Sequence, residues 1–309
     1  MLMIVAHHFA CHGGFSFSVD SVSLNRFWHV FIFMGGALGN DIFVMLSGYF
    51  LINSKGLNFR RLFNLWTRMF FYSVIIYCMF LLSGLEVFSL KTAVKVLLPV
   101  TKNQWWFAST YFVMYLIHPY VNRLLHSFTH EEYKKFLLSV MLYWCIIPAL
   151  TNSDFGANQT INFMCLYSLA GYVRFYPDDF KRKYIFYGLM FTGIFAVIVK
   201  KPMYLIGMMK PFTLLASLWL LISFSNLNIP HSKVINMIAS ATFGVYLIHD
   251  NNFVRPFIWK QLFRVASFQE SQYLIPYSLA VVLIVYISCT VLESIRSKIF
   301  RTLTRGYLS

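Results

Sequence analysis

Several histidines and charged side chains of this chain lie inside long apolar stretches, where a charge does not serve solubility. They are the pair His7 and His8, then Asp41, Arg68 and His118, and finally the pair His249 and Asp250. An ionisable side chain at the centre of a bilayer costs about 2.5–3.5 kcal/mol on insertion scales, so it normally faces the protein interior, a cavity or a partner. These residues are therefore candidates for chemistry.

A histidine beside a carboxylate is suited to acyl transfer. The neutral imidazole takes the proton from a hydroxyl that attacks a thioester or ester carbonyl, and the carboxylate orients the ring and stabilises the imidazolium. This chemistry needs no serine nucleophile. Ser47, in the segment LSGY, is a covalent alternative, but no G-x-S-x-G motif surrounds it and a small residue between helices usually serves packing.

Asp41 lies in the middle of the apolar run 27–51. As a helix these roughly 25 residues extend about 37 Å, against about 30 Å of hydrocarbon, so we expect Asp41 near the bilayer midplane. His118 and His249 are expected within several ångströms of the same depth, counted from the ends of their own segments. Different helices thus supply candidate groups at a similar depth.

Each candidate also has a purely structural interpretation. A single intramembrane histidine can be a hydrogen-bonded packing residue. Asp41 can form an ion pair with Arg68 that fixes helix packing, and Arg68 and Arg61 can be anchors on the cytoplasmic side. His12 and Asp20 are interpreted as loop residues without a functional role.

The composition indicates a polytopic membrane protein. Of 309 residues, 58% are hydrophobic and 12% are charged, and the mean hydropathy is +0.62. The net charge of +15 does not indicate a nucleic-acid partner, because the 26 Lys and Arg form short clusters between apolar runs. The five cysteines have no paired spacing and no Cys/His cluster, so we expect neither disulfides nor a metal site.

The apolar segments predict an all-α transmembrane bundle of about ten spans, with residues 1–309 forming one domain and the first span truncated. Most Lys and Arg fall in alternate loops, which predicts a cell-membrane protein with both termini cytoplasmic. No cleavable signal peptide is visible. The predicted spans are 1–11, 27–51, 62–83, 105–125, 136–151, 161–176, 184–199, 203–225, 234–258 and 273–295.

Four segments together resemble the acyltransferase-3 family of integral membrane O-acyltransferases. MLMIVAHHF is similar to the family's first span, an apolar run that ends in a histidine, and GNDIFVMLSGYFL to its second span. NQWWFASTYFVMYLIHPYVNRLL and ATFGVYLIHDN are similar to two later segments. The four occur in the family's order, and the resemblance extends over nearly the whole chain.

The resemblance implies transfer of an acyl group, commonly acetyl from cytoplasmic acetyl-CoA, to a hydroxyl of an envelope glycan or lipid-linked sugar. It places the catalytic histidine at His8, with His7 as the alternative. It places the second-span acid at Asp41 and a donor-side arginine at Arg68. The departures are Leu65, where a second arginine is expected before Arg68, and a missing first-span arginine.

The sequence therefore predicts a membrane O-acyltransferase with an acyl-CoA donor, a glycan or lipid-linked sugar acceptor and no metal. In this interpretation His8 is the general base and Asp41 its orienting carboxylate. The basic rim for the donor phosphates consists of Arg68, Arg61 and Arg60. The residues predicted to line the substrate cavity are Trp106, His118 and His249.

Two rival functions remain open from the sequence. One is a transporter or flippase for a lipid-linked sugar or acyl group, although no internal repeat or matched pair of broken helices is visible. The other is a membrane acyltransferase with a His/Asn pair, which the Asp41 segment fits poorly.

The first predicted span is short for a bilayer. Residues 1–11 supply about 16 Å of helix, and no basic residue precedes them. We therefore expect the native product to start ten or more residues upstream with an arginine there, the alternative being a short re-entrant or interfacial segment.

Overall fold

The computed structural model describes residues 1–18, 22–151, 153, 156, 158–180, 207–228 and 230–305. Within these ranges the chain is helical, and no described residue belongs to a strand. Contacts divide the chain into two compact units. Unit 1 consists of Met1–Gly36, Thr67–Trp105 and Ile229–Ser309, and unit 2 of Ala37–Trp66 and Trp106–Asn228. The single domain expected from the sequence stays a prediction.

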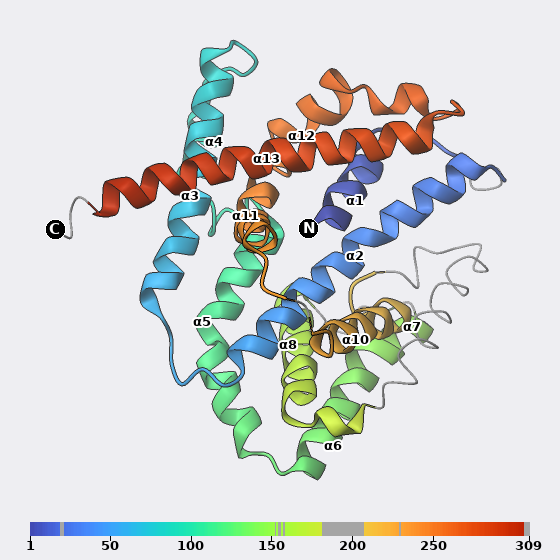
Figure 1. The fold of residues 1–309 in the computed structure, drawn as a ribbon, viewed down its shortest axis with the longest axis vertical. Coiled ribbons are helices and arrows are strands. Elements are labelled where there is room, and N and C mark those ends of the chain that lie inside the picture. Colours follow the sequence, from blue (N-terminus) through green and yellow to red (C-terminus); the bar gives the residue numbers. More distant parts are fainter. Residues whose placement is uncertain are drawn as a thin grey trace. The chain divides into compact units, whose positions relative to one another are not determined.

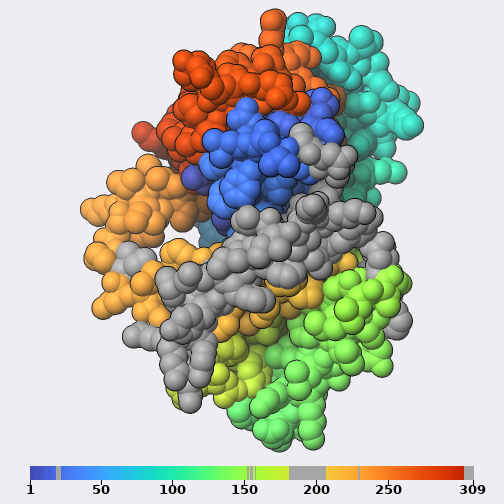
Figure 2. Space-filling model, turned by 90° about the vertical axis from the view of Figure 1, so that its right-hand side faces the viewer, coloured from blue at the N-terminus to red at the C-terminus, as the bar shows by residue number. Residues whose placement is uncertain are grey.

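Unit 1 is organised around its C-terminal helix, α13 (Leu274–Arg305), which packs against both α1 (Leu2–His12) and α11 (Lys233–His249) (Figure 1). The amide of Asn25 donates hydrogen bonds of 2.9 Å to the carbonyls of Gln269 and Ser271. Figure 2 shows these C-terminal segments, in orange to red, directly beside the N-terminal ones in blue. The unit also contains α4 (Leu90–Leu97), α12 (Val254–Pro256), η4 (Phe257–Leu262), η5 (Val265–Phe268) and parts of α2 (Leu24–Leu51) and α3 (Phe59–Leu82).

Unit 2 is built on α8 (Gln159–Phe175), which packs against α5 (Trp106–Ser127), α6 (His130–Met141) and α10 (Pro211–Ser225). Two of its buried tyrosine hydroxyls bond to neighbouring helices. Tyr133 donates to the carbonyl of Ser168 and Tyr167 to the side chain of Asn122, each at 2.7 Å. Such bonds between helices satisfy polar atoms that neither lipid nor an apolar core can satisfy. The unit also contains η1 (Leu142–Ile146), α7 (Ile147–Thr151) and η2 (Pro177–Asp179).

Among the described residues, four helical segments are long and apolar enough to cross a membrane. They are Leu24–Leu51, Phe59–Leu82, His130–Thr151 and Leu274–Thr302. Each coincides with a span expected from the sequence. Shorter apolar helices cover Leu2–His12 and Pro211–Ser225. The predicted span 184–199 lies outside the described residues, as does the start of the span 203–225.

The prediction of one continuous span over 234–258 is wrong, because α11 ends at His249. After the helix, the side-chain oxygen of Asn251 accepts a hydrogen bond of 2.9 Å from the backbone N–H of Phe253. Asn side chains that bond to nearby backbone groups compete with helix continuation. Apolar length alone does not reveal this competition.

Two segments that lie outside the predicted spans are helical. His12 is the last residue of α1, one turn after His8, and therefore lies on the same face of that helix. Lys91 and Lys95 belong to α4, a short helix with polar and apolar sides between α3 and α5.

We predict that Gly48→Ala destabilises unit 2, because the added methyl group would overlap the backbone of α8. A methyl group at Gly48 would lie 2.6 Å from the carbonyl oxygen of Tyr167 and 2.9 Å from its Cα. Both are backbone atoms of α8, so a side-chain rotation cannot relieve the overlap, and the expected cost is about 1–3 kcal/mol. Thermal unfolding of the detergent-solubilised chain measures it. Gly56→Ala is the control, because no heavy atom lies within 4 Å there; equal midpoints for the two variants would contradict the prediction.

Candidate active site

His8 and His249 meet inside unit 1, one from α1 and the other from the last residue of α11. The Nδ1 atom of His8 lies 2.9 Å from the Nε2 atom of His249. Only 8% of His8 is exposed, and His249 is fully buried. The contact joins His8 and His249, two candidates from opposite ends of the chain. The sequence analysis did not predict that they would be paired.

A backbone carbonyl determines which nitrogens of this pair carry protons. The Nδ1 atom of His249 lies 2.6 Å from the carbonyl oxygen of Val245, so in the neutral ring this nitrogen carries the hydrogen and donates it. The Nε2 atom of His249 is then an acceptor. His8 must donate to it from Nδ1, and the neutral His8 ring therefore keeps its lone pair on Nε2.

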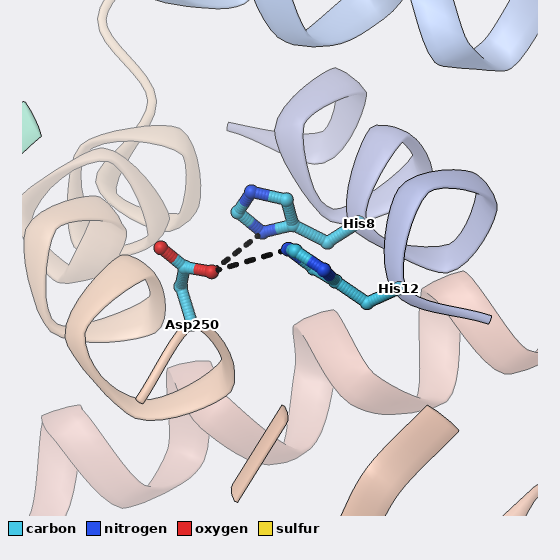
Figure 3. Close-up of side chains that lie close together, drawn as sticks. All are labelled: His8, His12 and Asp250. Atoms are coloured by element: carbon cyan, nitrogen blue, oxygen red, sulfur yellow. Dashed lines mark ion pairs between the residues drawn. The ribbon is translucent and has the colours of Figure 1, made fainter. Parts of the chain in front are cut away.

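Asp250 supplies the carboxylate beside this pair (Figure 3). Its Oδ1 atom lies 3.5 Å from Nδ1 of His8 and 3.8 Å from Nε2 of His12. The Nε atom of Arg255 lies 3.0 Å from the same oxygen, and Nη2 of Arg255 donates to the Asp250 backbone carbonyl at 2.9 Å. Only 2% of Asp250 is exposed. Arg255 therefore holds the carboxylate next to His8 and compensates its charge.

The sequence analysis missed His12 and Arg255 as members of this group. His12 joins it because residues four apart share a helix face, a spacing that is visible in the sequence. Arg255 joins it only because the chain turns after α11, which the sequence analysis did not predict.

His7 points to a different neighbour. Its Nδ1 atom lies 2.6 Å from the carbonyl oxygen of Phe33, and a methyl group placed at Gly36 would overlap its ring. His7 is thus packed against α2, within unit 1. Of the two adjacent histidines, His8 is the one that faces another histidine and a carboxylate.

Asp41 belongs to unit 2 and is fully buried. Its carboxylate lies beside the backbone of Met209, and neither oxygen has a side-chain hydrogen-bond partner among the described residues. His8 and Arg68 belong to unit 1. The expected pairing of Asp41 with His8, and the alternative pairing with Arg68, both stay predictions.

Arg68 contacts a buried carboxylate that the sequence analysis did not single out. Its Nη1 atom lies 3.8 Å from Oε1 of Glu293, of which 1% is exposed. Arg296 binds Glu293 through two hydrogen bonds of 2.7 Å, and the Tyr72 hydroxyl donates to it at 2.5 Å. A third of the Arg68 side chain remains exposed. Glu293 therefore positions the guanidinium, and the exposed part of the side chain remains accessible to a ligand.

Arg61 lines an open groove of about 390 Å³ in unit 2. The other lining residues are Phe43, Leu46, Ser47, Phe50, Leu51, Leu65, Tyr111 and Tyr115. Ser47 donates to the carbonyl of Phe43 at 3.0 Å and lies 3.2 Å from the Tyr111 hydroxyl, a pattern typical of packing rather than of an activated nucleophile. Arg60 is exposed at the start of α3.

The other two predicted cavity residues are packed within unit 2. His118 is buried, and its nitrogens lie 2.9 Å from the Ser54 hydroxyl and 2.5 Å from the Tyr115 carbonyl. The Trp106 ring contacts Phe107 and Phe163 edge to face. Their roles in a substrate cavity stay predictions.

A family model described as an acyltransferase domain matches residues 1–293 of the chain. The matched range includes His8, Asp41, Arg68 and His249. No curated protein and no solved structure matches the chain.

We predict that Glu293→Gln destabilises the protein. The substitution keeps the size of the side chain but leaves Arg296, a buried cation, without its counter-charge. Breaking a buried ion pair by removing one partner costs about 3–5 kcal/mol. Thermal unfolding in detergent measures the effect. Glu270→Gln removes an exposed carboxylate of the same unit and is the control; a Glu293→Gln midpoint equal to that of Glu270→Gln would show that the network does not stabilise the fold.

Proposed function

Because the chain belongs to the acyltransferase 3 family, we propose that it transfers acetyl from acetyl-CoA to a hydroxyl of an envelope glycan. The acceptor is a cell-surface polysaccharide or its lipid-linked sugar precursor. The observation that carries the proposal is the hydrogen-bond chain from Val245 through His249 to His8, which leaves a lone pair on Nε2 of a buried histidine. A general base needs that lone pair.

In the proposed reaction, Nε2 of His8 takes the proton of the acceptor hydroxyl while the oxygen attacks the thioester carbonyl. The tetrahedral intermediate then collapses, the carbon–sulfur bond breaks and CoA leaves as a thiolate. The imidazolium of His8 returns the proton to that sulfur. Atoms and charge balance without a covalent enzyme intermediate or a metal.

His249 and Asp250 are the proposed positioning residues. Nε2 of His249 accepts a hydrogen bond from Nδ1–H of His8 and fixes the ring, and the Asp250 carboxylate 3.5 Å from that nitrogen stabilises the positive charge that His8 gains. This is the role that the carboxylate plays beside a catalytic histidine in other acyl-transfer sites. Asp250 thereby takes the place that the sequence analysis gave to Asp41, which remains a second candidate acid.

On the donor side, we propose that arginines bind the phosphates of acyl-CoA. Arg68 is held by Glu293 with part of its side chain exposed, and Arg61 lies in an otherwise apolar groove. Guanidinium groups suit phosphate, and apolar walls suit a pantetheine or acyl chain. Arg60, exposed beside Arg61, completes the proposed basic rim.

The chain is a multi-pass membrane protein, as its family and its four long apolar helices show. About ten spans with both termini in the cytoplasm is the topology that we propose, from the distribution of Lys and Arg. In this topology the proposed basic rim of Arg60, Arg61 and Arg68 lies on the cytoplasmic side, where acyl-CoA is found.

We predict that His8→Ala abolishes acylation. Loss of a general base lowers the rate by about 10²–10⁴-fold. The measurement is the acetyl content of the envelope glycan in cells that lack other copies of the activity, at matched protein levels in the membrane. His231→Ala, a change at an exposed histidine, is the control. Full acetylation by a stably inserted His8→Ala variant would refute the base, and loss only in His7→Ala would move the role to that residue.

Asp250→Asn tests which carboxylate assists His8. We expect a fall in kcat of more than about tenfold with little change in the KM for acceptor, because the charge is needed when the imidazolium forms. Asp250→Glu should recover part of the rate, which a purely structural role would not give. If Asp41→Asn lowers kcat in this way and Asp250→Asn does not, the orienting acid is Asp41.

A further inference from the structure

Three side chains of unit 1 converge in an arrangement that resembles a metal site. They are His8 and His12, one turn apart on α1, and Asp250 at the end of α11 (Figure 3). One nitrogen from each histidine and one oxygen from Asp250 all lie within 4.8 Å of one another. All three point toward a common centre.

The spacing is close to what a zinc ion requires. Ligands at 2.0–2.2 Å from a tetrahedral Zn²⁺ lie about 3.3–3.6 Å apart. Oδ1 of Asp250 lies 3.5 Å from the His8 nitrogen and 3.8 Å from the His12 nitrogen. We propose that His8, His12 and Asp250 bind an exchangeable divalent metal ion of the zinc class. Two imidazoles and a carboxylate leave the fourth position to water.

The surroundings of the three ligands fit this role. Ligand carboxylates in metal sites are themselves held by hydrogen-bonding partners, and Arg255 lies 3.0 Å from Oδ1 of Asp250. Its positive charge also repels a divalent cation, so the site favours reversible binding over a permanent structural ion. An ion can enter beside His12, because 25% of that side chain is exposed, against 10% for His8 and 3% for Asp250.

Metal binding has a consequence that rests on the proposed function. The ion binds Nδ1 of His8, which donates to His249 in the metal-free site. A neutral imidazole with a metal on Nδ1 carries its hydrogen on Nε2 and has no lone pair left there. Zinc therefore removes the general base without touching the substrate. Bound metal and acyl transfer exclude each other.

Zinc retention by the purified full-length chain tests the site without any activity measurement. The protein, in detergent, is dialysed to equilibrium against a series of zinc chloride concentrations, and the zinc retained in excess of the dialysis buffer is measured by mass spectrometry. We expect the wild type and the control His231→Gln to retain zinc, and His12→Gln to bind it at least about tenfold more weakly. Equal midpoints of thermal unfolding without zinc show that His12→Gln is folded. Equal retention by wild type and His12→Gln, or none by the wild type, would overturn the proposal.

Acylation measured with and without zinc tests the consequence. We expect zinc to inhibit the wild type, a chelator to restore the rate, and His12→Gln to need about tenfold more zinc for the same inhibition. Zinc that binds through His12 without inhibiting would show that Nδ1 of His8 is not the ligand. Failure of the acyltransferase proposal leaves the retention result unaffected, so the two hypotheses can be rejected separately.

Discussion

The structure of the site depends on the requirement that polar atoms buried in an apolar interior have hydrogen-bond partners. His8 and His249 meet this requirement through a directional chain that starts at the backbone carbonyl of Val245. Each bond in the chain determines the next, because a neutral imidazole has one donor and one acceptor. The lone pair on Nε2 of His8 is therefore set by backbone geometry in another helix, and the chemistry of His8 depends on where α11 lies against α1.

Two further buried carboxylates among the described residues, Glu293 and Asp41, meet the same requirement to different degrees. Glu293 is surrounded by Arg296, Tyr72 and Arg68, so its charge is compensated from several sides. Asp41, equally buried, has no side-chain partner among the described residues. A carboxylate in such a place costs stability. Asp41 remains a proposed acid beside Asp250.

Hydrophobic length predicted α2, α3 and α13, because a long apolar run that contains few charges is typical of a buried or membrane helix. His8 and His249 could also be found, since a polar residue within such a run is conspicuous. Arg255 and Glu293 could not, because both lie near the ends of predicted spans, where charged residues are ordinary. The role of Glu293 depends on a contact with Tyr72, which is distant in sequence, and the role of Arg255 depends on the chain turn that brings it back to Asp250. No periodicity in either segment indicates these contacts.

The end of α11 shows how a local irregularity builds the site. His249 is the last residue of α11, and Asp250 caps the helix with a backbone N–H that still donates to the carbonyl of Tyr246 at 3.1 Å. Because the helix ends at His249, the chain turns and brings Arg255 back to the Asp250 backbone carbonyl, one of the acceptors that a helix end leaves unsatisfied. The same guanidinium then lies against the Asp250 carboxylate. A single arginine thus caps the helix end and holds the acid beside His8, and it reaches both groups only because the chain turns after His249, within a segment that the sequence analysis predicted to be one continuous span.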